Sequence, residues 1–229
     1  MAKTMLVTGA TGGIGAALVR VAGQRGYRVL AAGRDPARLD DLCREVPGAV
    51  PVLLDLCDPT DVARKLGDVQ SLDVLVHNAG IAEVASVEDT SLALWQETLT
   101  VHVIAAAELT RVLLPALRAA AGSVVFINAT QGMRAVPRWS AFMASKAALR
   151  ELADSLRVEE ARHGVRVTTI YPGGTATELL RRLRGKFGRP YDAAECIKPE
   201  SLAWLVLNVL DVPADAQVTE LSVLPAPRG

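Results

Sequence analysis

Short runs of apolar, strand-prone residues alternate along the chain with longer segments in which apolar residues recur at helical spacing. Strands are predicted in this way at 5–8, 28–32, 50–54, 73–78, 124–127, 165–170 and 218–223. Because several of these runs are apolar throughout, they are typical of strands buried on both faces of a parallel sheet. The alternation therefore predicts an α/β fold, a doubly wound parallel sheet of about seven strands with helices on both faces.

Helices are predicted at 14–22, 36–46, 92–120, 140–162 and 199–210, and a further helix is predicted to begin near Pro59. Pro115 is expected to kink or end the long helix at 92–120, because proline cannot donate a backbone hydrogen bond. Residues 174–198 contain many arginines and glycines and are expected to form a loop. No linker, repeat or low-complexity run interrupts the alternation, so we interpret residues 1–229 as a single domain.

The charged residues balance over the 229-residue chain. Its 25 basic and 25 acidic side chains cancel, so no overall field favours nucleic acid or an anionic membrane as a partner. One basic cluster stands out, formed by Arg181, Arg182, Arg184, Lys186 and Arg189. We interpret it as a solvated loop, with contact to a substrate or cofactor phosphate as the alternative.

The three cysteines, Cys43, Cys57 and Cys196, have spacings that fit no metal motif. We interpret them as buried small hydrophobic residues in a reducing compartment and expect no metal site. No signal peptide precedes the first strand, and no apolar run approaches the length of about 18 residues that indicates a membrane-spanning helix. The expected location is therefore cytoplasmic.

A glycine-rich turn directly follows the first strand, where residues 9–15 read Gly-Ala-Thr-Gly-Gly-Ile-Gly. Glycine lets the backbone turn tightly and approach a pyrophosphate, and the N-terminus of the next helix favours the negative charge. A strand before the turn, a helix after it and a second strand at 28–32 predict a dinucleotide-binding unit of the Rossmann type. A purely structural strand-to-helix turn is the alternative.

The end of the second strand distinguishes NAD from NADP. An acidic residue there would bind the ribose 2′-hydroxyl group and repel a 2′-phosphate. The chain instead has Gly33 followed by Arg34, whose guanidinium group can bind a phosphate through two hydrogen bonds. NADP(H) is therefore the expected cofactor, and the alternative is that Arg34 merely opens the next loop.

Three motifs of this chain resemble those of the short-chain dehydrogenase/reductase family. Three residues separate Thr8-Gly9 from Gly13-Ile14-Gly15, Asn78-Ala79-Gly80 follows the fourth strand, and residues 123–146 resemble the family's catalytic strand, loop and helix. The resemblance covers essentially the whole chain. It implies a nicotinamide cofactor, a small-molecule substrate held by the loop at 174–198, and a homodimer or homotetramer formed by the helices at 92–120 and 140–162.

The family places a catalytic Ser after this strand, a Tyr thirteen residues later and a Lys four residues after the Tyr. Here these positions hold Ala129, Phe142 and Lys146, and His102 stands where the family has a helical Asn. In the family the Tyr exchanges a proton with the substrate, the Ser polarises the carbonyl, and the Lys lowers the Tyr pKa and binds the nicotinamide ribose. Loss of a positioned acid typically lowers a rate by about 10²–10⁴, so ordinary ketone reduction should be impaired. Three departures together favour natural divergence over deliberate inactivation.

Other residues are candidates to replace the missing proton donor. His102 has a side chain that ordinarily titrates near neutrality, although an interior histidine is more often a core residue. Tyr171 lies beside the turn that the family places against the nicotinamide and is a second candidate acid. Ser140 and Ser145 lie on a helix with no adjacent base and are interpreted as structural.

The resemblance also implies the cofactor-binding residues, with Asp55 at the adenine edge and Thr175 and Thr177 near the nicotinamide amide or the pyrophosphate. For Asp55 the structural alternative is a hydrogen bond to the loop before the helix near Pro59. The full set is Gly9, Thr11, Gly12, Gly13, Ile14, Gly15, Arg34, Asp55, Leu56, Asn78, Ala79, Gly80, Lys146, Pro172, Gly173, Thr175 and Thr177.

Three functions fit this set of residues. The first is an NADP(H)-dependent oxidoreductase acting on the carbonyl or a related unsaturated group of a small metabolite, with an altered or disabled proton relay. The second is a non-redox enzyme, such as an isomerase, cyclase or dehydratase, that reuses the nucleotide pocket. The third is a catalytically inactive dinucleotide-binding protein. Consumption of NADPH and the identity of the product would separate them.

Overall fold

The computed structural model describes residues 2–131, 133 and 135–227. Within these residues the chain forms a seven-stranded sheet in the order β3-β2-β1-β4-β5-β6-β7, and each pair of neighbours is parallel. The strands are β1 (Thr4–Thr8), β2 (Arg28–Gly33), β3 (Ala49–Leu53), β4 (Val74–His77), β5 (Ser123–Ile127), β6 (Arg166–Pro172) and β7 (Glu220–Val223). The predicted α/β fold class is confirmed.

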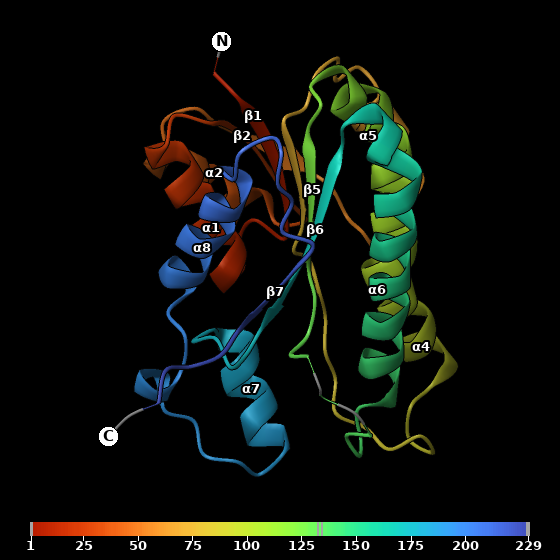
Figure 1. The fold of residues 1–229 in the computed structure, drawn as a ribbon. Coiled ribbons are helices and arrows are strands. Elements are labelled where there is room, and N and C mark those ends of the chain that lie inside the picture. Colours follow the sequence, from red (N-terminus) through yellow and green to blue (C-terminus); the bar gives the residue numbers. More distant parts are fainter. Residues whose placement is uncertain (1, 132, 134, 228–229) are drawn as a thin grey trace.

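Helices cover both faces of the sheet (Figure 1). One layer contains α1 (Gly13–Gln24), α2 (Pro36–Glu45) and α8 (Pro199–Leu210). The opposite layer contains α3 (Val62–Leu66), α5 (Ala105–Ala119) and α6 (Ser140–Glu160), with α4 (Leu92–Leu99) beside α6. The helix α7 (Glu178–Lys186) lies apart from both layers, beyond the carboxyl ends of the strands.

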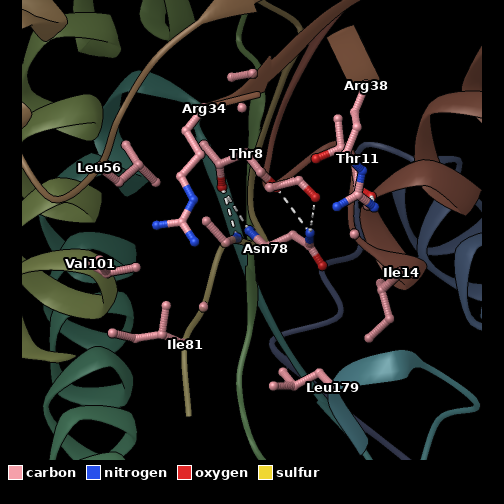
Figure 2. A pocket seen from close by; sticks show the side chains of 18 of the residues that line it. Thr8, Thr11, Ile14, Arg34, Arg38, Leu56, Asn78, Ile81, Val101 and Leu179 are labelled. Carbon is pink, nitrogen blue, oxygen red and sulfur yellow. Dashed lines mark hydrogen bonds between the residues drawn. The ribbon is translucent and has the colours of Figure 1, made fainter. Parts of the chain in front are cut away.

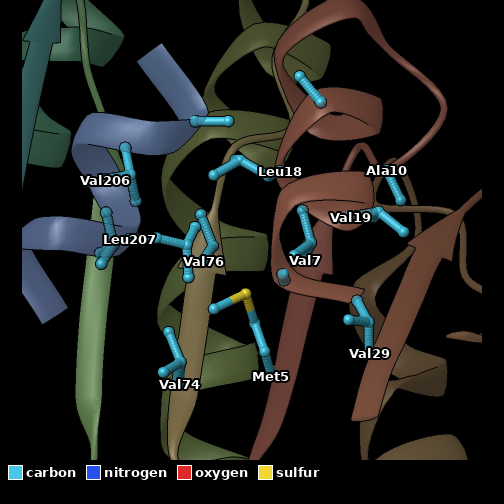
Figure 3. Close-up of a cluster of buried hydrophobic side chains, with 14 of the residues drawn as sticks. Met5, Val7, Ala10, Leu18, Val19, Val29, Val74, Val76, Val206 and Leu207 are labelled. Atoms are coloured by element: carbon cyan, nitrogen blue, oxygen red, sulfur yellow. The ribbon is translucent and has the colours of Figure 1, made fainter. Parts of the chain in front are cut away.

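Successive residues of the central strands enter opposite cores, because side chains alternate across a strand. In β1, Met5 and Val7 pack against α1 and α8 (Figure 3), whereas Leu6 packs toward α5 and α6. All three side chains are completely buried. This two-sided burial explains why the strand sequences are apolar throughout rather than alternating.

The predicted long helix at 92–120 differs from the structure in the position of its interruption. A π-helical turn, η2 (Thr100–Ile104), separates α4 from α5, and α5 continues through Pro115 to Ala119. Pro115 therefore does not end the helix, and the alternative expectation, that it kinks the helix, stays a prediction. Pro115 and Arg111, four residues before it, are both exposed, so water can satisfy the carbonyl that proline leaves unpaired.

The stretch Leu92–Ala119 is long and apolar enough to cross a membrane by length and composition alone. In this fold it lies against the sheet, and its residues Leu109, Leu113 and Leu117 are completely buried in the core. Its apolar composition is accounted for by this packing.

Two further expectations need correction. Residues 178–186 lie within the predicted loop but form α7, because Thr177 caps the helix by accepting a hydrogen bond from the Leu180 N–H at 3.2 Å. The helix gives way to a turn at Gly188, whose φ of 65° suits glycine. The cysteines are also less buried than expected, since Cys57 is exposed and Cys43 and Cys196 are partly exposed.

Candidate active site

A cavity of about 490 Å³ opens at the carboxyl edge of the sheet, between β1 and β4. The strand order reverses at this point, since β2 and β3 lie on one side of β1 and the remaining strands lie on the other. Open α/β sheets bind ligands at such a switch point. The lining comes from the glycine turn, the ends of β2 and β4, the segment after β3, and the start of α7 (Figure 2).

Thr8 and Asn78 hold the two edges of this cavity together. The Thr8 hydroxyl group accepts hydrogen bonds from the backbone N–H groups of Asn78 and Ala79, at 2.9 and 3.1 Å, and donates to the Val76 carbonyl at 3.1 Å. The Asn78 amide donates to the Thr8 carbonyl at 2.9 Å (Figure 2). Asn78 therefore fixes the end of β4 against the start of the glycine turn.

The glycines of the turn are required by close backbone packing. A Cβ atom on Gly15 would lie 2.1 Å from the Gly9 carbonyl oxygen, and one on Gly9 would lie 2.8 Å from the Ala79 Cα. Gly9 also has a φ of 62°, which favours glycine. This packing brings the N-terminus of α1 to the cavity, where its free N–H groups suit an anion such as a pyrophosphate.

Two guanidinium groups lie at the end of the cavity formed by β2 and α2. Arg34 and Arg38 both line it (Figure 2), and Arg38 donates a hydrogen bond to the Thr11 carbonyl at 2.7 Å. Arg34 lies directly after β2, at the place where a nucleotide ribose binds in Rossmann folds. The two cations make this end of the cavity suitable for a phosphate group.

Asp55 lies at the neighbouring wall of the same cavity, with Leu56 and Cys57. Its carboxylate accepts a hydrogen bond from the Cys57 N–H at 2.9 Å, so it orders the loop after β3. Asp58, rather than Asp55, caps the short helical turn that begins at Pro59. Asp55 thus has a structural role in the loop and remains in a position to contact a ligand.

The cavity brings together most of the residues expected to bind a cofactor. Its lining includes Gly9, Thr11, Gly12, Gly13, Ile14, Gly15, Arg34, Asp55, Leu56, Asn78, Ala79, Gly80 and Thr177. Of the described residues in the expected set, Lys146, Pro172, Gly173 and Thr175 do not line it. The Thr175 hydroxyl group donates to the Gly173 carbonyl at 3.1 Å, and the Pro172 carbonyl accepts from the Thr130 hydroxyl group at 2.9 Å.

Lys146 is buried on α6 and points toward the end of β5. Its ammonium group donates a hydrogen bond to the Ile127 carbonyl at 3.0 Å and lies 5.8 Å from the centre of the Phe142 ring. Burial lowers the pKa of Lys146 to about 8. The side chain therefore carries a cation into a poorly solvated site at the end of the segment 123–146, which resembles the family's catalytic segment.

The neighbouring positions of the catalytic segment are apolar. The Phe142 ring stacks on Trp139, with centroids 4.1 Å apart and an interplanar angle of 9°. Ala129 has no polar side-chain atom, and its N–H donates to the Asn128 side chain at 2.8 Å. Asn128 in turn donates to the Lys146 carbonyl at 3.1 Å, so the Ala129 and Lys146 positions are held together.

His102 lies in the π-helical turn η2 and joins three parts of the site. Its Nε2 atom accepts a hydrogen bond from the Ile81 N–H at 3.0 Å, so the proton of the neutral ring must be on Nδ1. Nδ1 then donates to the Ser145 hydroxyl group at 2.7 Å, and Ser145 donates to the Phe142 carbonyl at 2.7 Å. Ser145 therefore has an adjacent histidine, contrary to the expectation from its helix.

Burial, together with the positive charge of Lys146, lowers the pKa of His102 to about 2. The ring is consequently neutral at physiological pH, and its one proton is already used in the hydrogen bond to Ser145. A catalytic role for His102 stays a prediction, and it would have to proceed from a neutral imidazole rather than an imidazolium.

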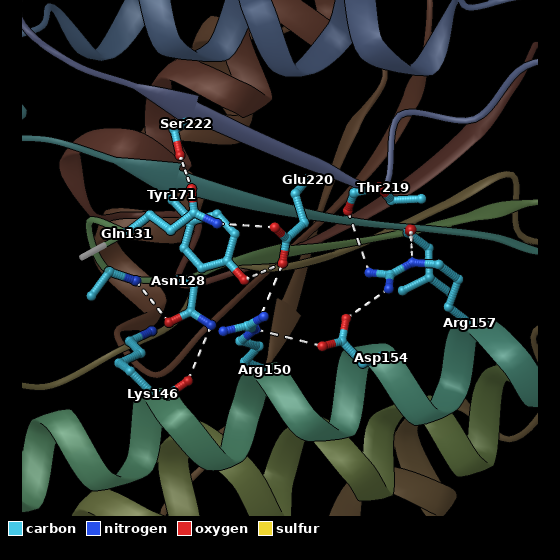
Figure 4. A network of polar contacts seen from close by, with 12 residues as sticks. Asn128, Gln131, Lys146, Arg150, Asp154, Arg157, Tyr171, Thr219, Glu220 and Ser222 are labelled. Atoms are coloured by element: carbon cyan, nitrogen blue, oxygen red, sulfur yellow. Dashed lines mark hydrogen bonds and ion pairs between the residues drawn. The ribbon is translucent and has the colours of Figure 1, made fainter. Parts of the chain in front are cut away.

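Tyr171 does not line the cavity. Its phenol group donates a hydrogen bond to Glu220 on β7 at 2.9 Å, and the same carboxylate accepts from Gln131 at 3.0 Å (Figure 4). Burial, aided by the Glu220 carboxylate, raises the pKa of Tyr171 to about 12. The geometry therefore gives Tyr171 a structural partner and makes its phenol a weak acid.

Several residues that line the cavity were absent from the sequence prediction. They are Arg38, Cys57, Ile81, Val101, Leu179 and Arg182, among others. Arg38 lies in the first turn of the predicted helix at 36–46, only four residues after Arg34 in the sequence, and this proximity was an available signal. The sequence placed Arg182 only in the basic cluster. Its position in the cavity wall depends on helix α7, which the sequence did not predict.

Comparison with known proteins agrees with this geometry. The family model described as short chain dehydrogenase matches residues 3–186. A Sinorhizobium fredii protein, the uncharacterized short-chain type dehydrogenase/reductase y4eK, is 37% identical over 228 residues, covering 97% of this chain and 91% of its own. Human dehydrogenase/reductase SDR family member 11 is 30% identical over 244 residues, covering 97% and 94%.

A solved structure of a metagenomic short-chain oxidoreductase in complex with NADP has a TM-score of 0.84 with this chain. It is 28% identical, and the match covers 99% of this chain and 98% of that one. The protein belongs to the short-chain dehydrogenase/reductase family. Members of this family bind nicotinamide dinucleotides, and the cavity residues described above fit such a ligand.

The two buried histidines predict a specific dependence of stability on pH. Burial lowers the pKa of His77 to about 3 and that of His102 to about 2, whereas both ordinarily titrate at about 6.5. Below about pH 6.5 the unfolded chain therefore binds protons that the folded chain does not. The free energy of unfolding should fall as the pH is lowered from about 7 to 5, by at most about 2.7 kcal/mol per pH unit.

Urea unfolding at several pH values in this range measures the slope, and His77→Gln and His102→Asn should each remove about half of it. If the free energy of unfolding of both variants changed with pH as steeply as that of the unsubstituted protein, the two rings would not be buried in their neutral form.

Proposed function

We propose that this protein is an NADP(H)-binding oxidoreductase of the short-chain family that acts on a small metabolite without the usual tyrosine acid. The observation that carries the proposal is the coexistence of a well-formed dinucleotide cavity with an apolar catalytic segment. Arg34 and Arg38 line the cavity, whereas Phe142 and Ala129 occupy the positions of the proton donor and of the carbonyl-polarising group. Substrates that need no strong acid, such as an activated C=C or C=N bond, suit this arrangement.

Preference for NADP(H) over NAD(H) rests on the charge at the end of β2. Arg34 follows the strand directly where an acidic residue would select NAD, and Arg38 supplies a second cation. The solved NADP complex of a relative is consistent with this preference. The glycine turn and Thr177 would hold the pyrophosphate, and Asn78 and Gly80 would lie beside a ribose.

The remaining chemistry follows from the residues near Lys146. A bound NADPH supplies the hydride, which is the difficult step of such reductions. Lys146 would contribute its cation and a hydrogen bond to a ribose, and the His102–Ser145 link would keep the Lys146 turn of α6 fixed against Ile81. With no acidic group at position 142, protonation of the product would come from water or from the substrate itself.

The runner-up function is a non-redox enzyme or an inactive dinucleotide-binding protein. The aromatic stack of Phe142 and Trp139 favours it, because these rings and Phe187, whose ring centroid lies 5.7 Å from that of Trp139 in an edge-on contact, make the surroundings of position 142 apolar. Either of these functions predicts that the protein binds NADP(H) without consuming it.

The cofactor preference is tested with Arg34→Ala. We expect the affinity for NADP⁺ to fall about tenfold while the affinity for NAD⁺ is unchanged, because only the 2′-phosphate contacts are lost. Isothermal titration calorimetry with both nucleotides measures the effect. Arg44→Ala is the matched control, since Arg44 is an exposed cation on α2 that pairs with Asp41 and does not line the cavity. An equal loss for the two nucleotides would contradict selection by Arg34.

The reaction is tested by following NADPH oxidation over a panel of ketones, enones and imines. The unsubstituted protein is compared with Phe142→Tyr, Ala129→Ser and the double variant. On ketones we expect the double variant to be faster by about 10²–10⁴, since it restores a positioned acid. If the unsubstituted chain already reduces ketones and the double variant gains nothing, the acid is supplied elsewhere, and His102 is the next residue to change. Binding of NADPH without consumption by any variant would support the non-redox function.

We also propose a homodimer or homotetramer in which the α4–α5 and α6 helices of two subunits pair. Support comes from exposed apolar side chains on these elements, including Ile104 and Val158, which are 53% and 79% exposed. Size-exclusion chromatography with light scattering should give two or four times the mass of the 24.2 kDa chain. A monomer at micromolar concentration would contradict this assembly.

The cytoplasmic location and the absence of nucleic-acid and membrane partners stay predictions.

A further inference from the structure

One carboxylate, that of Glu83, ties helix α7 to the loop that follows β4. It pairs with Arg182 at 3.4 Å and also contacts the ammonium group of Lys186. Residues four apart lie on the same face of a helix, so both cations of α7 point toward Glu83. Arg182 additionally donates a hydrogen bond to the Ala82 carbonyl at 3.1 Å.

The charges at this contact do not balance, since Glu83 serves two cations. The neighbouring Arg181 is already paired with Glu178 at 2.7 Å. Glu83 and Arg182 are both partly exposed, with 36% and 49% of their side-chain areas accessible, so the pair is screened and weak. A ligand with greater negative charge can therefore compete with Glu83 for the guanidinium group.

Arg182 is also part of the cavity wall. It lines the cavity together with Thr177, Glu178 and Leu179, all from the start of α7. The opposite wall is the glycine turn, and the two walls meet where a Cβ atom on Gly13 would lie 2.6 Å from the Thr177 methyl group. Arg182 thus faces the same space as the N-terminus of α1, the group best suited to a pyrophosphate.

We propose that Arg182 is a binding residue for the cofactor diphosphate, and that Glu83 competes with the cofactor for it. In the free protein Glu83 and the Ala82 carbonyl hold the guanidinium group, and the diphosphate takes over this cation when it enters the cavity. Glu83 thereby weakens cofactor binding and favours cofactor release. This inference rests on the proposed function, because it requires a dinucleotide in the cavity.

Other contacts keep α7 in place when the Glu83 pair is removed. At one end of the helix Thr177 caps α7 and packs against Gly13. At the other end Phe187 contacts Trp139 edge-on, with ring centroids 5.7 Å apart. Neutralising Glu83 should therefore free Arg182 without detaching the helix, which makes the competition measurable.

Calorimetric titration with NADP⁺ tests the competition through three single variants. Glu83→Gln should tighten binding about two- to fivefold, the range that partly exposed ion pairs contribute. Lys186→Gln should weaken binding about twofold, because Glu83 then interacts with Arg182 alone. Arg182→Gln should weaken binding about five- to tenfold and should abolish the gain from Glu83→Gln when the two changes are combined.

Adenosine 2′-phosphate is the control ligand, because it carries the adenosine end of NADP⁺ without the diphosphate. Its affinity should be the same in all variants, and rising salt concentration should reduce the differences among their NADP⁺ affinities. Equal NADP⁺ affinities in the unsubstituted protein and Glu83→Gln would overturn this inference and leave the proposed function standing. Equal shifts for both ligands would overturn it too. Failure of the unsubstituted protein to bind either NADP⁺ or NAD⁺ would overturn the proposed function and the inference together.

Discussion

The close approach of the backbone at the carboxyl ends of β1 and β4 is the constraint on which the site depends. A side chain on Gly15 would collide with the Gly9 carbonyl, and one on Gly9 would collide with Ala79. Asn78 binds the carbonyl groups of Thr8 and Gly9 from the neighbouring strand. This contact sets where α1 begins and therefore where its free N–H groups point. The cofactor cavity, its arginines and the wall formed by α7 are all arranged around that position.

The sequence was informative where local chemistry decides the structure. The central strands are apolar because both faces of the sheet are covered. That pattern predicted the fold class and the existence of all the strands described in the structure, although most strand ends differ by one or two residues. The glycine turn could also be predicted from the sequence, because the backbone geometry of one strand-turn-helix unit requires glycine at these positions. Arg34 at the end of β2 belongs to the same short unit, and it lines the cavity as expected.

Features that depend on tertiary contacts were not predictable from the sequence. His102 and Ser145 are 43 residues apart, and only the packing of η2 against α6 places their side chains at hydrogen-bond distance. Helix α7 was missed because its arginines and glycines resemble a loop, and with it the position of Arg182 was missed. The environment that lowers the pKa of His102 is likewise a property of the folded core. The sequence alone therefore could not show whether His102 is a proton donor or a neutral residue with structural hydrogen bonds.

The π-helical turn at Thr100–Ile104 has a consequence for how this region can change during evolution. A π-helical turn closes its hydrogen bonds between residues i and i+5, so it accommodates one residue more than an α-helical turn while the faces of α4 and α5 keep their orientation. Deleting one residue of the turn would restore an α-helical turn and leave Leu109 and Leu113 in the core. A deletion beyond the turn, within the first residues of α5, would instead rotate the rest of this 15-residue helix by about 100° and turn its buried face away from the core.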